Sequence, residues 1–489
     1  MGVQPAALAG ALPELEESAL MTDIADLSAL ELLALYRSRE LSPVEAAEAC
    51  LARIEALNPV VNAFSQLDRE RTLAEARAAE RRYAEDAAHG LVDGVPVAVK
   101  DIFMQQGWPN LKGSLTVDEH QLAAEDAPAV AALKRHGMVT MGRTTTPEFG
   151  WKGVTDNPRE GITRNPWDAD KTPGGSSGGS ASAVVLGMAP LALGTDAGGS
   201  IRMPAGYAGL FGHKPTHGLC PMWPPSAFYP LAHVGPMTRT VRESALLMDV
   251  LVEGDPRDAT LAPPAAEYLA ALEQPLGRLR VAFSADFGFY RHVDPEIAEA
   301  VAAAVHVFEA ELGCVVETVD PGFDDPIEAF GTLFYGGAAN ALRDLSPQQR
   351  AVMDPGLVQV AEQAAGLSLL DYTAAMNVRA DLTERMGRFH ARYDLLLSPA
   401  LPIPAFKAGL EVPEGWYNER WPSWSPFTYP FNMTGQPAAS VPCGFTRAGL
   451  PIGLQIVAAR HRDALVLQAA HAYQQARPLT DRRPALLDA

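Results

Sequence analysis

Serine and glycine are concentrated in residues 172–204, TPGGSSGGSASAVVLGMAPLALGTDAGGSIRMP, and this composition suits nucleophilic catalysis. A serine hydroxyl attacks a carbonyl carbon efficiently only when a neighbouring base takes its proton. The best-known serine hydrolases use a histidine as that base, yet this stretch contains no histidine. The serines are therefore either structural or activated by a different side chain.

Ser177 is one candidate nucleophile, because Gly175 to Gly179 satisfy the GxSxG pattern. Such a nucleophile elbow must be entered from a β-strand. The residues before it, NPWDADKTP, are polar and interrupted by proline, which argues against a strand. A phosphate-binding P-loop is also excluded, because no lysine follows the glycines at the required position.

Ser200 is the second candidate, since it follows two glycines directly after the apolar run PLALGTD. Successive glycines allow consecutive N–H groups to point the same way and to bind an anion. The Ser200 hydroxyl would then lie beside an oxyanion hole. The expected donors are the N–H groups of Ala197, Gly198, Gly199 and Ser200. A tight structural turn is the alternative explanation.

Lys100 is the candidate base, one of only seven lysines in the chain and the last residue of the apolar run VPVAVK. Burial disfavours the charged form of a lysine and lowers its pKa by up to about 3–5 units. A neutral lysine can act as a general base. The alternative is a lysine at a strand end whose amine reaches solvent.

Together these stretches resemble the amidase signature family of hydrolases. The resemblance is carried by GVPVAVKDIF, GGSSGGSASAV, LALGTDAGGSIRMPAGYAGLFGHKPTHG and FNMTGQPAASVPCGFTRAGLPIGLQIVA, and it extends over most of the chain. It implies a Ser, cis-Ser, Lys triad in which Ser200 is the nucleophile, Ser176 the bridging serine in a cis peptide and Lys100 the base. In that family the bridging serine lies 24 positions before the nucleophile, which selects Ser176 over Ser177.

The neighbours of the triad are expected to support it. Ser177 and Thr195 can form hydrogen bonds within the site, and Asp196 and Arg202 flank the nucleophile loop as a pair of opposite charges. FGHKPTHGLCP departs from the wording usual in the family, and His213, His217 and His233 are not expected to be catalytic. Histidine spacing gives no metal site, so the enzyme is expected to use no metal and no cofactor.

Two aromatic loops are candidates for binding the substrate, CPMWPPSAFYP and EGWYNERWPSWSPFTYPFN. Large rigid aromatic side chains can line an apolar cleft. Such a cleft would favour aryl or bulky apolar amides, and also carbamates and activated esters. The candidate residues are Trp223, Phe228, Trp421, Trp424 and Phe427. The alternative is that these side chains cover the core or a contact between protomers.

Composition limits the other classes of function. A net charge of −20 and a pI of about 5.0 give little support to binding of a phosphate backbone. The four cysteines are far apart and fit a reduced cytoplasmic protein. Residues 1–20 lack the pattern of a signal peptide, and no apolar run is long enough to span a membrane. A cytoplasmic monomer or homodimer that binds a small amide or carbamate, but no nucleic acid or membrane, is expected.

Helical and strand patterns alternate along the 489 residues without a long linker. Several strands, including the one that ends at Lys100, are apolar enough to be buried on both faces. This order predicts an α/β fold: a single large domain with a central mixed β-sheet covered by helices on both faces. The domain is expected to occupy residues 21–489, with residues 1–20 as an N-terminal extension that need not be ordered.

Two other functions stay open at this point. Within the family, the chain could be the glutaminase subunit of a tRNA-dependent amidotransferase, although aromatic loops suit a charged glutamine poorly. From a different class, it could be a non-catalytic scaffold that kept the fold. A degenerate site has no physical need for Lys100, Ser176, Ser200 and the glycines together, so hydrolysis of amides is the favoured interpretation.

Overall fold

One mixed β-sheet of 11 strands runs through the whole molecule, in the order β1-β3-β2-β6-β8-β7-β12-β13-β11-β9-β10. We describe a computed structural model of the chain, in which residues 23–262, 264, 266–479 and 482–488 are described. The strands are β1 (Phe64–Gln66), β2 (Pro96–Lys100), β3 (Val139–Thr144), β6 (Leu191–Asp196), β7 (Phe211–Lys214), β8 (His233–Thr238), β9 (Arg280–Phe283), β10 (Val315–Thr318), β11 (Leu395–Pro399), β12 (Ala438–Phe445) and β13 (Pro451–Ala458). A separate small sheet pairs β4 (Asp156–Asn157) with β5 (Gly161–Ile162).

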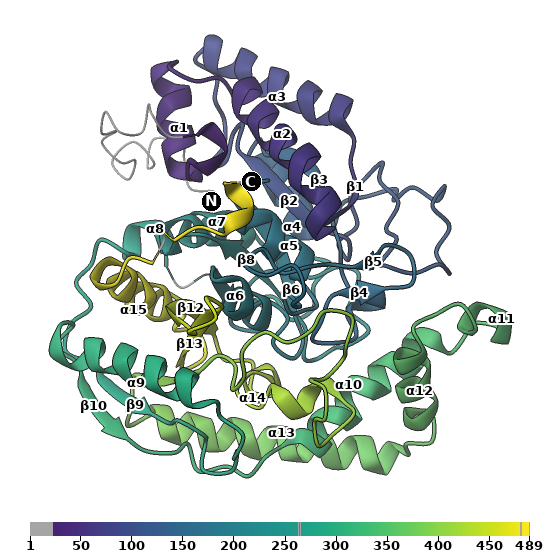
Figure 1. Cartoon of the computed structure of the whole chain (residues 1–489), viewed down its shortest axis with the longest axis vertical. Helices are drawn as coiled ribbons and strands as arrows, with labels where there is room; N and C mark the ends of the chain where they lie inside the picture. The colour runs from purple at the N-terminus through teal and green to yellow at the C-terminus, as the bar shows by residue number, and fades with distance from the viewer. Residues whose placement is uncertain (1–22, 263, 265, 480–481, 489) are drawn as a thin grey trace.

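The helices surround this sheet, and they divide by position along the molecule. Figure 1 shows α1 to α3 at one end of the long axis and α9, α10, α12 and α13 toward the other. The α-helices are α1 (Ala29–Ser38), α2 (Pro43–Val61), α3 (Arg69–Ala84), α4 (Pro128–Arg135), α5 (Gly178–Val185), α6 (Arg202–Ala208), α7 (Val241–Leu251), α8 (Tyr268–Ala271), α9 (Pro295–Ala310), α10 (Ile327–Leu342), α11 (Pro347–Arg350), α12 (Pro355–Ala364), α13 (Leu369–His390), α14 (Tyr429–Met433) and α15 (Asp463–Ala476). Short 3-10 helices are η3 (Ile24–Asp26), η4 (Glu148–Gly150), η5 (Trp421–Trp424) and η6 (Ala485–Leu487).

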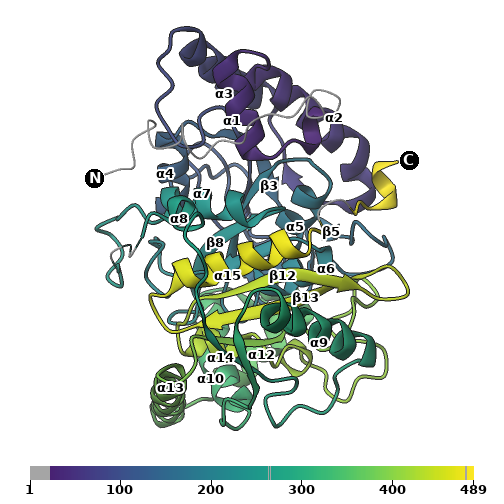
Figure 2. The same ribbon diagram turned by 90° about the vertical axis from the view of Figure 1, so that its left-hand side faces the viewer.

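Helices bury both faces of the sheet. Because alternate side chains of a strand point to opposite faces, the residues of one strand contribute to two different core clusters. In β6, Leu191 and Leu193 pack into a core cluster with α4, α7, α9 and α15, whereas Ala192 faces a second cluster with α2, α5 and α6. Figure 2 shows α15 lying across β12 and β13. Farther along the sheet, α10, α12 and α13 cover the face opposite α9 and α15.

The expected fold class is confirmed: the chain is a large α/β fold around one mixed sheet. The strand predicted to end at Lys100 is β2, and it runs parallel to both of its neighbours, β3 and β6. The predicted closing strand pair is the antiparallel pair of β12 and β13. The expected extension, residues 1–20, lies outside the described residues.

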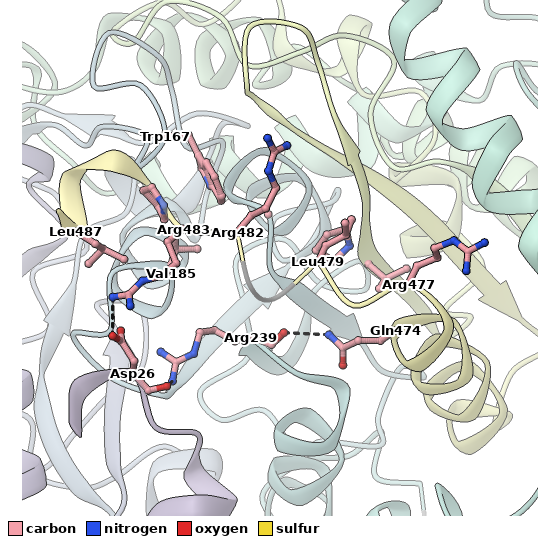
Figure 3. A pocket seen from close by; sticks show the side chains of 14 residues that line it. Asp26, Trp167, Val185, Arg239, Gln474, Arg477, Leu479, Arg482, Arg483 and Leu487 are labelled. Carbon is pink, nitrogen blue, oxygen red and sulfur yellow. Dashed lines mark hydrogen bonds and ion pairs between the residues drawn. The ribbon is translucent and has the colours of Figure 1, made fainter. Parts of the chain in front are cut away.

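The C-terminal part of the described chain returns to the N-terminal helices. Figure 3 shows the pocket where they meet: Arg483 pairs with Asp26 at 2.6 Å, and Gln474 donates to the Arg239 carbonyl at 3.2 Å. Leu487 of η6 packs against the same apolar cluster as α2. None of the residues that line this pocket is a predicted catalytic residue.

Candidate active site

Lys100 ends β2 in the middle of the sheet, and its amine contacts three hydroxyl groups. Its Nζ lies 2.7 Å from Ser176 Oγ, 2.9 Å from Ser177 Oγ and 2.8 Å from Thr195 Oγ1. The parallel strands β2 and β6 end at the same edge of the sheet, which brings Lys100 and Thr195 together. Ser176 and Ser177 immediately precede α5, and the peptide bond between Gly175 and Ser176 is cis.

The hydrogen bonds around Nζ distinguish the two serines. Ser177 Oγ donates its proton to the Thr195 carbonyl at 3.2 Å, so toward Lys100 it can only accept. A neutral amine has two N–H donors and one lone pair, so one of three hydroxyl neighbours can donate to it. Because Ser177 is an acceptor, the lone pair is available to the hydroxyl of Ser176 or Thr195.

The electrostatic surroundings favour a neutral lysine. Lys100 is fully buried, and burial lowers its pKa well below the ordinary value of about 10.4, while the charge of Asp196 opposes that shift. Within the described residues, Lys100 forms no ion pair with a carboxylate. The amine can therefore accept a proton from a hydroxyl, as a general base must.

Asp196 and Arg202 form a buried ion pair that holds the loop between them. Arg202 Nε lies 3.0 Å from Asp196 Oδ2, and Nη2 lies 3.1 Å from Oδ1. Burial alone would raise the pKa of Asp196, but the Arg202 charge and hydrogen bonds bring it down to about 2. Arg202 also donates to the Thr428 carbonyl, Gln455 Oε1 and Asn432 Oδ1, at 2.9, 2.9 and 2.6 Å.

Ser200 lies on this loop, next to the two serines that contact Lys100. Its carbonyl accepts a hydrogen bond from the Ser177 N–H at 3.2 Å, and the residue is 6% exposed. The Gly199 N–H donates to Asp196 Oδ1 at 2.6 Å, so it already has an acceptor. In the part of the chain that the structure describes, the N–H groups of Ala197, Gly198 and Ser200 have none.

A cavity of about 160 Å³ opens at this cluster, with Ser176, Thr195 and Ala197 in its wall. The rest of the lining is mostly apolar and aromatic and includes Trp223 and Phe228. A cavity of about 150 Å³ in another protein accepts benzene. The cavity therefore has room for one group of about that size next to the serines.

The other three aromatic candidates do not line this cavity. Trp421, Trp424 and Phe427 are at most 1% exposed and belong to the core packed against α10 and α13. Trp421 packs against the loop that carries Ser200, because a Cβ on Gly198 would lie 2.6 Å from its ring. The two aromatic loops thus divide: one forms the cavity wall, and the other forms the core.

The match to known proteins decides the family. Residues 45–467 match the amidase family. An acylamidase from Rhodococcus erythropolis is 37% identical over 468 residues, which cover 94% of this chain and 97% of that protein. The chain belongs to the amidase signature family.

Other relatives and solved structures agree with this assignment. A bacterial aryl acylamidase of the amidase signature family aligns with this amidase at a TM-score of 0.88 and 31% identity, covering 96% of this chain and 99% of the other. A glutamyl-tRNA(Gln) amidotransferase subunit from Cupriavidus pinatubonensis is 35% identical over 489 residues, covering 92% of this chain and 96% of that protein. The protein is an enzyme that hydrolyses amides.

His213, His217 and His233 do not line the cavity at Ser176. His217 and His233 line a neighbouring cavity that shares Trp223 with it, and His213 is buried with its Nε2 3.3 Å from Asp463 Oδ1. Burial lowers the pKa of all three, that of His217 to about 4. Among the described residues there is no group of acidic, histidine and cysteine side chains that could hold a metal ion, and no helix is long and apolar enough to cross a bilayer.

Sequence reasoning missed several residues that hold the site. Thr428, Asn432 and Gln455 all bind Arg202, and Asn432 Nδ2 also donates to Asp196 Oδ1 at 2.8 Å. They lie more than 200 positions from Arg202 in the sequence, and no spacing rule connects them to it. Asn432 and Gln455 lie in a stretch that carries the family resemblance, but the sequence did not show that both side chains bind Arg202.

Proposed function

We propose that this amidase cleaves aryl or bulky apolar amides through an acyl-enzyme on Ser200. The observation that carries the proposal is the buried Lys100 amine, which lies 2.7 Å from Ser176 Oγ and forms no ion pair with any described carboxylate. Neutral Lys100 takes the proton of Ser176, which takes the proton of Ser200. Ser200 Oγ then attacks the carbonyl carbon of the amide.

The tetrahedral oxyanion is stabilised by N–H groups of the nucleophile loop. Those of Ala197, Gly198 and Ser200 are the proposed donors, because Gly199 donates to Asp196. Loss of one such donor in other hydrolases typically lowers the rate about 10²–10³-fold. Ser176 donates the proton that it took from Ser200 to the leaving nitrogen as the C–N bond breaks, and Lys100 returns a proton to Ser176. A water molecule then hydrolyses the ester and regenerates Ser200.

The preference for an aryl or bulky apolar group is supported by the cavity wall. Trp223 and Phe228 line it together with Ile102 and Phe149, and its volume suits one aromatic ring. Carbamates and activated esters present the same carbonyl to the same nucleophile. We propose them as additional substrates, and we propose that the enzyme acts without a metal, a cofactor or a partner protein.

The assignment of the nucleophile is tested by labelling with a fluorophosphonate, which reacts with activated serines. Intact mass and peptide mapping of the wild type should give one adduct, on Ser200. Ser200→Ala should give none, and Ser182→Ala, which changes another buried serine of the same stretch, should label normally. An adduct on Ser177, or no adduct on the wild type, contradicts the proposal.

A glutaminase subunit is the second candidate, because amidotransferase subunits are among the relatives. Glutamine carries an ammonium group as well as a carboxylate, and burial of an ammonium group requires an acidic partner. No aspartate or glutamate is among the described residues that line the cavity. Release of the amine from an aryl amide by the purified chain alone supports the hydrolase. Hydrolysis of glutamine but of no aryl amide would support the glutaminase.

A further inference from the structure

One charged side chain lines the otherwise mostly apolar cavity at Ser176. Among the described lining residues, Lys112 is the one with a formal charge, and the polar remainder is Asn110 and a few hydroxyl groups. A partly buried ammonium group normally has an ion-pair or hydrogen-bond partner. This side chain is therefore unusual in its position.

The Lys112 ammonium has no such partner in the protein. Within the described residues it forms no ion pair and no hydrogen bond, and its nearest aromatic contact is the Phe149 ring, whose centroid lies 5.9 Å away. The nearby Asp101 carboxylate is occupied, because it pairs with Arg143 at 3.4 Å and accepts the Lys112 backbone N–H at 2.9 Å. Burial lowers the pKa of Lys112 only partly, since Asp101 opposes the shift.

The backbone holds Lys112 at the cavity wall. Its N–H is bound by Asp101, which directly follows Lys100, and its carbonyl accepts the Phe149 N–H at 2.8 Å. The N–H of Lys112 is thus bound to the segment that carries the predicted base, and its carbonyl is bound to Phe149, which lines the same cavity. The backbone of Lys112 is therefore held at the cavity wall before a substrate binds, so that only its side chain has to be ordered on binding.

We infer that Lys112 binds a carboxylate on the substrate, so that the preferred substrates are amides with an aryl or apolar body and an anionic group remote from the cleaved bond. This inference rests on the function proposed above and names its substrate class. A charge-assisted hydrogen bond from ammonium to carboxylate satisfies donors that the protein leaves without acceptors. A substrate cation would instead be repelled by Lys112.

The test compares substrates that differ in one group. Glutaryl-4-nitroanilide carries a terminal carboxylate where pentanoyl-4-nitroanilide carries a methyl group, and 4-acetamidobenzoate differs from 4-acetamidotoluene in the same way on the amine side. We define the anionic preference as the ratio of kcat/KM for the charged and the methyl substrate. In the wild type it should be at least about tenfold for one of the two pairs, a difference of about 1.4 kcal/mol.

Variants of Lys112 test whether the anionic preference depends on the charge of this side chain. Lys112→Met should bring the anionic preference close to one, and Lys112→Arg should retain most of it. Lys407→Met, which changes an exposed lysine paired with Glu414, is the matched control and should keep the wild-type preference. A wild-type preference near one for both pairs overturns the inference, and so does a preference that Lys112→Met leaves unchanged.

A binding measurement keeps this inference separate from the proposed mechanism. In the Ser200→Ala background, calorimetry with glutaryl-4-nitroanilide should give a Kd at least about tenfold weaker when Lys112 is also changed to Met. Binding that depends on Lys112 without turnover of any amide would contradict the mechanism and support the role of Lys112. Turnover of the methyl substrates with equal Kd values would support the mechanism and overturn the role of Lys112.

Discussion

At the scale of single residues, the proposed chemistry depends on the Lys100 amine, whose neutral form burial favours. Lys100 is surrounded by hydroxyl groups instead of carboxylates, and Asp196, the acid that acts on it, is neutralised by Arg202. A carboxylate next to Lys100 would stabilise the ammonium and remove the base. The proposed relay thus requires that the Asp196 carboxylate pairs with Arg202 and not with Lys100.

The first prediction concerns pH. In the proposed mechanism Lys100 acts in its neutral form. The value of kcat/KM for a neutral aryl amide should therefore fall as the pH falls through the pKa of Lys100, and should be constant above that pKa. Because burial places that pKa well below its ordinary value, the plateau should be reached well before pH 10. A rate that keeps rising up to about pH 10 would indicate a lysine with an ordinary pKa and would contradict the proposed base.

The second prediction concerns Gly198. A Cβ at this position would lie 2.6 Å from Trp421 Cη2 and 2.8 Å from Phe330 Cζ, so Gly198→Ala must displace the nucleophile loop or the core. We expect kcat/KM to fall at least about 10²-fold, the loss typical of one oxyanion donor. Gly387→Ala is the control: it adds a Cβ on exposed α13 that meets no atom within 4 Å, and activity should be unchanged. Equal activity of both variants would show that the loop tolerates the displacement.

At the scale of elements, one arginine joins segments from distant parts of the chain. Arg202 begins α6 and binds Asp196 at the end of β6, Asn432 in α14 and Gln455 in β13. The loop that carries Ser200 is enclosed by these contacts. Its geometry is therefore set by the packing of strands and helices around it, and the glycines make that geometry accessible.

The third prediction is that Arg202→Met strongly destabilises the protein. Removal of one partner of a buried ion pair leaves a charge without compensation and typically costs about 3–5 kcal/mol. Arg388→Met, which removes an exposed arginine of α13, should cost less than about 0.5 kcal/mol. Thermal unfolding at pH 7 measures both changes.

The pH dependence of the melting temperature of Arg202→Met tests whether the lost ion pair with Asp196 causes the destabilisation. The folded pKa of Asp196 is about 2, below the ordinary value of about 3.9 for an unfolded chain. Its stabilising contribution is therefore fully present above about pH 4 and is lost as the pH falls toward 2. The difference in melting temperature between the wild type and Arg202→Met should narrow as the pH is lowered from 7 to 3. A difference that stays constant would mean that the ion pair is not its source.

At the scale of the whole molecule, the sheet connects the N-terminal helices to the C-terminal strands, and contacts at the surface close the chain on itself. Asp23 caps η3 and pairs with Arg53 of α2 at 2.5 Å, and Asp26 pairs with both Arg53 and Arg483. Among the described residues, these are the contacts nearest to the start of the chain. These contacts make Asp23 and Asp26 part of the folded domain, and we propose that the domain occupies residues 21–489.

The fourth prediction follows from these contacts. Deletion of residues 1–20 should leave the melting temperature within about 1 °C of the wild type and should retain full kcat/KM. Deletion of residues 1–27 also removes Asp23 and Asp26, which are the carboxylate partners of Arg53 and Arg483, and should lower the melting temperature measurably. Loss of activity in the shorter deletion would show that the first 20 residues belong to the domain.

Local patterns predicted several of the strands and drew attention to Lys100 and Ser200, and the family resemblance supplied the candidate triad. Apolar runs identified β2 and β6, with Lys100 at the end of the first and Ser200 shortly after the second, because the pattern of apolar residues in a strand is a property of neighbouring residues. The closing strands were predicted for the same reason. The choice of Ser176 over Ser177 depended on the family spacing, and the hydrogen bond of Ser177 to the Thr195 carbonyl is consistent with it.

Only the tertiary structure decided which side chains meet. Trp223 and Trp424 both occur in proline-rich aromatic loops, yet one lines the cavity and the other is buried in the core. Whether an aromatic ring faces solvent depends on which elements pack over it, and this is not encoded in its own neighbours in the sequence. The same holds for Lys112 and Asn432, whose roles depend on contacts between segments far apart in the chain. The sequence by itself identified the candidate reacting groups, because residue types and their spacing can be read along the chain. The packing of the sheet and its helices determined what surrounds these groups, because it joins segments far apart in the sequence.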